Sequence, residues 1–458
     1  MNKIRISKHH YQLLCHHLFP GDDREAVALA LCSRNIHGSD HILQILELFP
    51  VAYEDCYERK PDLVRWPTNL VNPLLEKAMG RGYAILKIHC HPGGGERFSE
   101  FDDESDQTLF SSVHAWLDST QPHASCIMLP DKRLFGRFFT ADMQIETIHQ
   151  ISVAGDDLLF WNYSEMPELD ERLQARNLQT FGRGTVQQFS QMRIGVVGNS
   201  GTGSPTIEQL KRLGVKELVL VDPDYIDHVN LNRILGATLQ DANQQVPKPE
   251  VMKREIEKVG FGTTVTCFNS TVAEPAVINA LAQCDVLFSC VDGIEGRHIL
   301  NLISSCYLIP LFDMGVKLQA DGKGGITGIY GTVHYIIPGG SSLLSRKQYT
   351  MAGLQAESIR RADQAGILKN QYLADVQESQ PAVISINMQI AAIAVNDFLA
   401  RIHPFRNFDN DEVNIIRYWY CELLTKLECD NEPCPVFSHY VGLGDCEPLL
   451  NTPQFGKL

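Results

Sequence analysis

Apolar runs and helical patterns alternate along the first third of the chain. Residues 24–32, 83–89 and 124–130 are continuous apolar runs of strand length. Residues 102–118 have a helical pattern instead, with acidic side chains in the first turn. This mixture predicts an α+β domain over residues 1–165.

A more regular alternation follows a polar, helix-like connector at residues 166–191. Near-continuous Val, Ile and Leu strands separated by helices predict a parallel, doubly wound sheet. The predicted strands are 193–198, 217–222, 264–269 and 285–292, and the predicted helices are 204–214 and 248–260. Residues 310–345 are expected to form hairpin or crossover strands, and 380–402 a buried apolar helix. We therefore expect a Rossmann-like α/β domain over 192–402, completed by a tail at 403–458.

Composition and charge exclude several classes of function. The chain has 458 residues, 44% hydrophobic and 21% charged, as in a globular protein of two or three domains. Its net charge of −15 argues against a general binder of nucleic acid or of anionic membranes. No apolar run has the roughly 18 residues of a membrane span, and the basic N-terminus lacks a signal-type apolar core. We expect a cytoplasmic protein.

The number and spacing of the cysteines argue against disulfide bonds. The chain has 13 of them, an odd number, and no C-x-x-C pair. This disfavours a disulfide scaffold and a ribbon-type zinc site, so most thiols are expected in the core of a protein in a reducing compartment. Residues 307–420 contain no cysteine.

The stretch HCHPGGGERFSEFD, residues 89–102, contains the first candidate site. His89 ends a predicted strand and His91 lies two residues on, so both side chains can point the same way. Two imidazoles with the carboxylate of Asp102 are a catalytic zinc set that leaves a fourth position for water. Glu25 is the candidate general base, and Ser99 could stabilise an oxyanion. For a bare H-x-H pair, a solvated loop is the simpler interpretation.

The full pattern resembles the JAB/MPN metalloprotease (JAMM) signature over roughly residues 1–160. It has H-x-H-P, then S-x-x-D, with a glutamate in an upstream strand-like run. The resemblance implies zinc ligands at His89, His91 and Asp102, a base at Glu25 and an oxyanion contact at Ser99. Cys90 stands where the signature more often has Ser or Thr, and it is given no role beyond packing.

The second candidate site begins with RIGVVGNSGTGSPTIEQLKRLG, a strand, a glycine-rich turn and a helix. Glycines let the backbone approach phosphates, and the helix N-terminus offers amide donors. Gly198, Gly201 and Gly203 are present, but Ser200 lies where the dinucleotide pattern has its second glycine. Asp222, at the end of the next strand, could hold a ribose hydroxyl. A dehydrogenase is therefore one interpretation.

Residues further on favour ATP chemistry. Arg233 and Lys248 supply cations for a triphosphate, Asn230 supplies an amide, and Asp292 a carboxylate suited to Mg²⁺. A nicotinamide enzyme needs no such set. Taken singly, Arg233 could be a surface cation and Asp292 a turn former; their order and spacing carry the argument.

Together these residues resemble the E1-like, ThiF/MoeB-type adenylyltransferases over about residues 170–400. The resemblance implies that one ATP site is lined by Gly198, Gly201, Gly203, Asp222, Asn230, Arg233, Lys248 and Asp292. Asp224 and Asn232 are weaker candidates. In that family an arginine ahead of the first strand can reach the phosphates across a homodimer, and Arg176 is the match.

The cysteine pattern departs from many E1-like enzymes. Their catalytic cysteine usually lies in a crossover segment, here about residues 335–380, which contains none. The enzyme could stop at the acyl-adenylate, or a tail cysteine could take the acyl group. The tail cysteines, which could equally be structural and match a metal site only weakly, are Cys429, Cys434 and Cys446.

The combined hypothesis is a bifunctional enzyme. A zinc peptidase would hydrolyse an amide or isopeptide bond at the C-terminus of a ubiquitin-like or sulfur-carrier-like protein, and an ATP- and Mg²⁺-dependent adenylyltransferase would activate its C-terminal glycine. Such a fusion resembles bacterial systems that conjugate ubiquitin-like modifiers, some of which act in anti-phage defence, and an E2-like partner would fit that role. The alternatives are processing of a sulfur carrier for cofactor or cysteine metabolism, and a non-enzymatic scaffold.

Overall fold

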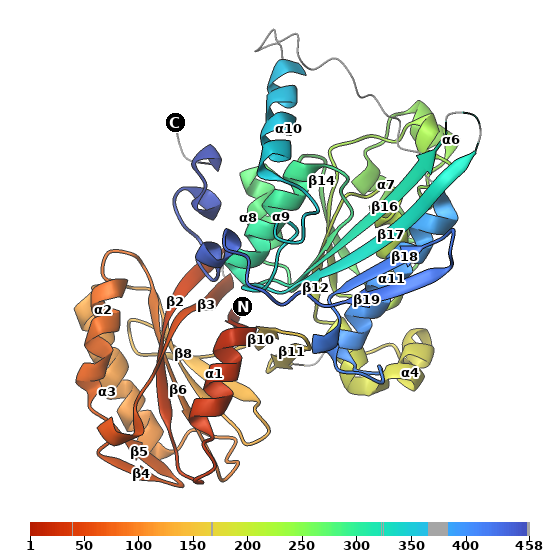
Figure 1. The fold of residues 1–458 in the computed structure, drawn as a ribbon. Coiled ribbons are helices and arrows are strands. Elements are labelled where there is room, and N and C mark those ends of the chain that lie inside the picture. Colours follow the sequence, from red (N-terminus) through yellow and green to blue (C-terminus); the bar gives the residue numbers. More distant parts are fainter. Residues whose placement is uncertain (39, 166–167, 322, 324, 365–382, 456–458) are drawn as a thin grey trace. The chain divides into compact units, whose positions relative to one another are not determined.

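The structure is a computed structural model of the whole chain, and it describes all residues except 39, 166–167, 322, 324, 365–382 and 456–458 (Figure 1). The chain divides into two compact units. The first is Met1–Glu165 with Cys306–Leu308 and Tyr440–Leu458, and the second is Met166–Ser305 with Ile309–His439. Each unit is built around its own large sheet.

The first unit has a nine-stranded mixed sheet in the order β11-β10-β1-β3-β2-β6-β7-β8-β9. Its strands are β1 (Asn2–Ser7), β2 (Val27–His37), β3 (Asp40–Pro50), β6 (Ala84–Cys90), β7 (His123–Met128), β8 (Leu134–Phe139), β9 (Ile145–Thr147), β10 (Gln150–Ala154) and β11 (Leu158–Asn162). A separate hairpin is made by β4 (Glu58–Lys60) and β5 (Leu63–Arg65), and the helices are α1 (Lys8–Leu18), α2 (Asn72–Ala78) and α3 (Glu100–Leu117). The three strands and the helix expected from the sequence all form.

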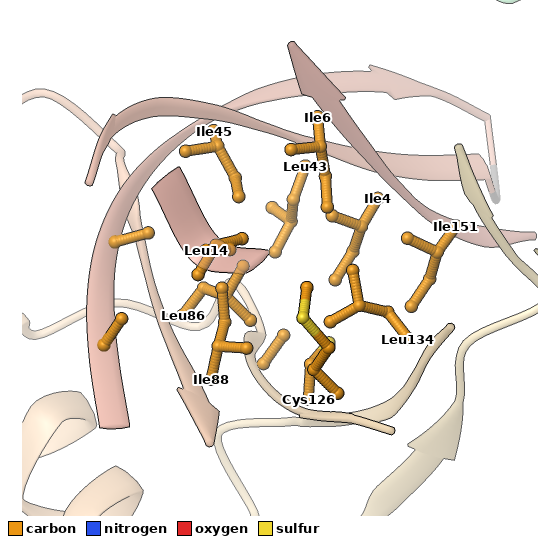
Figure 2. Packing of buried hydrophobic residues seen from close by; sticks show 14 of the residues in the cluster. Ile4, Ile6, Leu14, Leu43, Ile45, Leu86, Ile88, Cys126, Leu134 and Ile151 are labelled. Atoms are coloured by element: carbon orange, nitrogen blue, oxygen red, sulfur yellow. The ribbon is translucent and has the colours of Figure 1, made fainter. Parts of the chain in front are cut away.

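Buried apolar side chains cover both faces of this sheet. On one face, residues of β1, β3, β6 and β7 pack with Leu14 of α1, as Figure 2 shows. On the other face, Val27, Leu29 and Ile85 pack with Phe110 and Val113 of α3. Burial on both sides explains why β2 and β6 are continuous apolar runs rather than alternating ones. The burial of β6 extends to its last residues, His89 and Cys90, so the His-x-His pair begins inside the packed sheet.

The second unit has an eight-stranded sheet in the order β14-β13-β12-β15-β16-β17-β18-β19. Its strands are β12 (Arg193–Val197), β13 (Glu217–Val221), β14 (Thr264–Phe268), β15 (Val286–Ser289), β16 (Leu311–Ala320), β17 (Ile326–Ile336), β18 (Ile415–Trp419) and β19 (Leu424–Glu428). The helices are α4 (Glu171–Phe189), α5 (Gly203–Arg212), α6 (Leu239–Asn243), α7 (Lys248–Glu257), α8 (Pro275–Ala282), α9 (Ile294–Tyr307), α10 (Met351–Gln364) and α11 (Ile384–Ile402).

The doubly wound part of this sheet is as predicted, but the sheet as a whole is mixed. Strands β14, β13, β12, β15 and β16 are parallel neighbours. From β16 onward each pair is antiparallel. β16 ends at Ala320 and β17 begins at Ile326, and strands separated by so few residues can only be antiparallel. The predicted helix at 380–402 is α11, which packs against α5, β16 and β17 and buries Ala394 and Phe398.

The tail differs from its prediction. We expected residues 403–458 to complete the second domain, and β18 and β19 do so. From Tyr440 onward, however, the chain belongs to the first unit. There the Ser33 hydroxyl donates to the Gly442 carbonyl at 2.6 Å, and the Asp445 amide donates to the Arg34 carbonyl at 2.7 Å. These bonds involve the Ser33 hydroxyl and the Arg34 carbonyl, which lie in the C-terminal half of β2.

Within the described ranges, no helix has the length and apolarity needed to cross a membrane.

Candidate functional site

The His-x-His pair and Asp102 converge in the first unit. His89 is the penultimate residue of β6, which is paired on one side with β2 and on the other with β7. Its Nε2 lies 3.0 Å from Asp102 Oδ1 and 3.2 Å from His91 Nε2. One ligand atom from each of the three residues lies within 4.8 Å of the others. Among the described residues this is the group of three that could hold a metal ion.

The hydrogen bonds around the cluster fit a cation at its centre. His91 Nδ1 donates to the Gly95 carbonyl at 2.8 Å, so Nε2 is the ring nitrogen that faces the cluster. That Nε2 lies 3.5 Å from Asp102 Oδ2. Without a metal ion, a proton on Nε2 joins the imidazole to the carboxylate, and a bound cation would take the place of that proton. The donor set of two imidazoles and one carboxylate therefore fits Zn²⁺.

Ser99 and Asp102 form the cap of α3. The Ser99 amide and hydroxyl donate to Asp102 Oδ2 at 2.9 and 2.7 Å, and Ser99 Oγ accepts from the Asp102 amide at 3.1 Å. This capping box anchors Oδ2 and leaves Oδ1 facing His89. Burial opposes ionisation of Asp102, but hydrogen bonds from His89 and His91 hold its pKa below the usual range. To contact an oxyanion, the Ser99 hydroxyl would have to leave Asp102.

Glu25 lies beside the cluster, in the segment just before β2. Its Oε1 is 3.8 Å from His91 Nε2. Burial raises the pKa of Glu25 to about 8, and the nearby His91 opposes that rise. The sequence predicted a strand from residue 24, whereas β2 begins at Val27, so the Glu25 carboxylate extends from a loop end rather than from the strand. The structure thus brings together all five residues predicted for the first site.

A buried ion network holds α3 on the sheet next to this cluster. Lys87 Nζ on β6 lies 2.6 Å from Asp106 Oδ1, and Arg137 Nη2 on β8 lies 2.8 Å from Asp106 Oδ2. Lys87 and Asp106 are buried, and Arg137 also pairs with Asp103. Because Lys87 is two residues before His89 and Asp106 is one helical turn after Asp102, the network fixes the two ligand-bearing elements against each other. Residue spacing alone gave no signal for this network.

In the second unit, the glycine loop between β12 and α5 is too tight for side chains. Gly198 has φ of +87°, and a Cβ there would lie 2.5 Å from the Cys290 carbonyl oxygen. A Cβ on Gly203, the first residue of α5, would lie 1.8 Å from the Gly198 carbonyl oxygen. The helix N-terminus therefore lies directly against the loop, where its free amides can bind phosphate.

Asp222 lies at the end of β13, beside this loop. It accepts the Asn199 amide at 2.6 Å and the Asp224 amide at 2.9 Å. Lys248 Nζ lies 3.5 Å from Asp222 Oδ1 and 2.7 Å from Asp224 Oδ2. Burial raises the pKa of Asp222, and Lys248 opposes the rise. Asp222 therefore places a hydrogen-bond acceptor next to the glycine loop, and Lys248 places a cation beside that acceptor.

A cavity of about 1560 Å³ joins these groups. Of the predicted residues, it is lined by Gly198, Gly201, Asp222, Asp224, Asn230, Arg233, Lys248 and Asp292. Gly203 and Asn232 are not among the lining residues, and the Asn232 side-chain oxygen accepts from Arg233 Nη1 at 3.1 Å. Arg176 is exposed on α4, bonds Gln179 at 2.9 Å and is not among the lining residues. Its role across a dimer stays a prediction.

The comparison with protein families decides the class of this unit. The model described as "ThiF family" matches residues 173–431, more than half of the chain. The chain belongs to the ThiF family. We call the matched region the ThiF domain.

Some curated relatives of the ThiF domain are named for ubiquitin-like modifiers, and others for sulfur carrier proteins. The chain is 26% identical over 175 residues to ubiquitin-like modifier-activating enzyme 5 of Bombyx mori, covering 35% of this chain and 41% of that protein. It is 23% identical over 158 residues to the sulfur carrier protein ThiS adenylyltransferase of Bacillus subtilis, covering 34% and 44%. It is 31% identical over 119 residues to the SAMP-activating enzyme E1 of Haloferax volcanii, covering 26% and 43%. The chain thus spans about two fifths of the length of these relatives.

Solved structures are more distant. A crystal structure of E. coli MccB with AMPCPP and MccA has a TM-score of 0.45 and 16% identity, covering 58% of this chain and 74% of that one. A likeness at this level carries no functional argument.

Three further residues of the ThiF domain line the cavity, and none of them had a role predicted from the sequence. Arg297 Nε on α9 lies 3.2 Å from Asp313 Oδ1 on β16, and Arg297 Nη1 donates to the Asp292 carbonyl at 3.3 Å. Burial raises the pKa of Asp313, while Arg297 opposes the rise. Asn387 of α11 lies against Gly201, where a Cβ would be 2.4 Å from its Nδ2. Arg297 was visible five residues after Asp292, but Asp313 and Asn387 join the site only through strand order and helix packing.

The tail cysteines differ in access. Cys434 is 1% exposed, and Cys446 is half-buried with a pKa raised by burial. Cys429 is exposed, as is Cys421 in the turn between β18 and β19. Cys290 lines the cavity, but burial raises its pKa to about 12, so it stays a neutral thiol. Residues 365–380 of the crossover segment lie outside the described residues.

Gly203→Ala is expected to weaken ATP binding by the ThiF domain by about 5- to 140-fold, because overpacking costs about 1–3 kcal/mol and every 1.4 kcal/mol is tenfold. The added methyl group would meet a backbone carbonyl that cannot move without opening the loop. Isothermal titration calorimetry with ATP measures the effect. Gly184→Ala in α4, where a Cβ has no atom within 4 Å, is the matched control and should bind as the unchanged protein does. Unchanged affinity in Gly203→Ala would contradict the phosphate role of this loop.

Proposed function

We propose that the ThiF domain adenylates the C-terminal carboxylate of a small ubiquitin-like or sulfur-carrier protein. Family membership supports the reaction class, and the residues lining one cavity support the ATP site. The names of the relatives support the substrate class, since they include enzymes that activate a ubiquitin-like modifier and a sulfur carrier. An E2-like partner and a homodimer stay predictions.

In this reaction, a carboxylate oxygen of the carrier's last residue attacks the α-phosphorus of ATP. The bond from that phosphorus to the oxygen bridging to the β-phosphate breaks, and pyrophosphate leaves. Asp222 would accept from a ribose hydroxyl, and Arg233 and Lys248 would offset the charge that develops on the phosphates. Asp292 would hold Mg²⁺, which neutralises phosphate oxygens when bound. In phosphoryl transfer, catalysis comes almost entirely from such positioning together with electrostatic stabilisation.

We further propose that the first unit is a JAMM-type zinc peptidase acting on the same carrier terminus. The observation that carries this is the convergence of His89, His91 and Asp102 with a carboxylate, Glu25, 3.8 Å away. Bound Zn²⁺ would polarise the scissile carbonyl and acidify a water molecule. Glu25 Oε1 would take the proton of the attacking water and pass it to the leaving amine.

The two activities are tested on the full chain with ubiquitin-like and sulfur-carrier proteins that end in glycine. Adding such a carrier should raise ATP–pyrophosphate exchange at least about tenfold, and removing its last glycine should abolish the rise. The same carrier fused to a C-terminal extension should be cut after the glycine, and a zinc-selective chelator, used with excess Mg²⁺, should stop the cutting without affecting ATP–pyrophosphate exchange. If ATP–pyrophosphate exchange does not depend on the carrier's last residue, the adenylation proposal is contradicted. If cleavage continues after zinc is removed, the peptidase proposal is contradicted.

The carrier assays also separate the two biological roles. Transfer of the activated carrier to a lysine amine favours a conjugation system, including one in anti-phage defence. Transfer to a sulfur donor favours cofactor or cysteine metabolism. The buried Cys434 argues against that thiol as the acceptor, whereas Cys429 and Cys421 are accessible.

A further inference from the structure

We propose that Cys90 is a positioning residue that holds Glu25 in place beside the His pair; this inference rests on the proposed peptidase function. From the sequence alone, Cys90 was expected only to pack in the core. In the structure its side chain joins the segment bearing the general base to the strand bearing the metal ligands. This contact is a hydrogen bond from the residue after Glu25.

The strand geometry sets the direction of the Cys90 side chain. Side chains alternate along β6, so Cys90 points to the face opposite His89. It is fully buried there, in the core cluster that Figure 2 shows in part. Cys90 is therefore directed away from the proposed metal position and can act only through the backbone.

The backbone amide and the sulfur of Cys90 both form hydrogen bonds with the backbone of Ala26. The Cys90 amide donates to the Ala26 carbonyl at 3.2 Å, and the Cys90 Sγ accepts from the Ala26 amide at 3.2 Å. The thiol also donates to the carbonyl of Leu18, the last residue of α1, at 2.9 Å. One side chain thus ties the end of α1, the start of β2 and the end of β6 together. A neutral thiol can make both bonds, because sulfur accepts weakly while the S–H group donates.

Glu25 itself is held from the other side. Its amide donates to the Lys60 carbonyl at 2.8 Å, and its carbonyl accepts from Arg59 Nε at 2.9 Å. With the two Ala26 groups bound by Cys90, the peptide units on both sides of Glu25 are fixed. Because Glu25 precedes β2 and has no ladder partner, these bonds replace the sheet as the support of the base. An error of about 1 Å in such a group can lower the rate of catalysis by about 100-fold.

The matched variants are Cys90→Ala, Cys90→Ser and Cys126→Ala. Cys126 is also buried in the same cluster, on the adjacent β7, and pairs in register with Ile88. Cys126→Ala therefore removes a buried thiol of the same size without touching Ala26. Cys90→Ser keeps a donor and acceptor at the position.

Three measurements are made on the full chain: hydrogen exchange of the Ala26 amide in zinc-free protein, zinc content, and kcat and KM for cleavage of a carrier fusion. In Cys90→Ala we expect hydrogen exchange of the Ala26 amide to be at least about tenfold faster. We expect kcat for cleavage to be about tenfold lower, with zinc content and KM unchanged. Cys90→Ser should restore both, and Cys126→Ala should match the unchanged protein.

Equal losses in Cys90→Ala and Cys126→Ala would overturn the inference, because packing alone would then explain them. Unchanged kcat and exchange in Cys90→Ala would overturn it too. If the unchanged protein binds no zinc and cuts no fusion, the proposed peptidase fails. The exchange measurement still decides, in that case, whether Cys90 fixes the segment of Glu25.

Discussion

Asp292→Ala is expected to abolish carrier-stimulated ATP–pyrophosphate exchange, with a loss of at least about 100-fold. Asp292 follows β15, is exposed and lines the cavity beside Arg297, whose Nη1 binds its carbonyl. The proposed role of its carboxylate is to hold Mg²⁺ against the triphosphate. Without that ligand, the charge that develops on the leaving pyrophosphate is not neutralised.

The loss should come from chemistry and not from unfolding. An exposed side chain without structural bonds contributes within about 0.5 kcal/mol to stability, so thermal melting should be unchanged. Asp292→Asn, which keeps the shape and removes the charge, should lose nearly as much exchange as Asp292→Ala. Glu274→Ala removes an exposed carboxylate that does not line the cavity and should keep full exchange. Robust exchange in Asp292→Ala would refute the assignment of the ATP site.

His91→Ala is expected to remove zinc from the first unit and to abolish peptidase activity. His91 is the cleaner of the two histidines to change, because its side chain is 13% exposed whereas that of His89 is 1% exposed and sits within the sheet. Loss of a neighbouring support residue typically weakens a metal site by about 10–100-fold, and loss of a ligand should cost more. Metal analysis of protein purified with equimolar Zn²⁺ measures the change.

Two further variants separate metal binding from catalysis. Glu25→Gln should keep zinc and lose about 10²–10⁴-fold in kcat, as expected when a general base is removed. His37→Ala, an exposed histidine at the end of β2 and outside the cluster, should keep both zinc and activity. If zinc content in His91→Ala equals that of His37→Ala, the first site is not a metal site. ATP–pyrophosphate exchange should be the same in all three.

The two candidate sites were predictable to different depths. In the first site, ligands and cap lie within a single stretch of 14 residues, and the spacing itself implies a strand end, a loop and a helix start. Only Glu25 comes from elsewhere, and its exact support could not be predicted. In the second site the glycine loop is local, but Asp222, Lys248 and Asp292 follow separate elements. The family resemblance implied that these residues line one site, and the parallel strands explain it, because their carboxyl ends lie at one edge of the sheet.

The sequence by itself determined part of the local structure: several of the strands and helices, where the glycine loop turns, and which residues at strand ends carry charge. Each depends on periodicity or on neighbours a few residues away. Only the tertiary structure decided the Arg297–Asp313 pair, the Lys87–Asp106–Arg137 network and the bond between Cys90 and Ala26. It also placed the chain from Tyr440 onward with the first unit. These contacts join residues far apart in the chain, so they depend on strand order and register, for which a single sequence has no local signature.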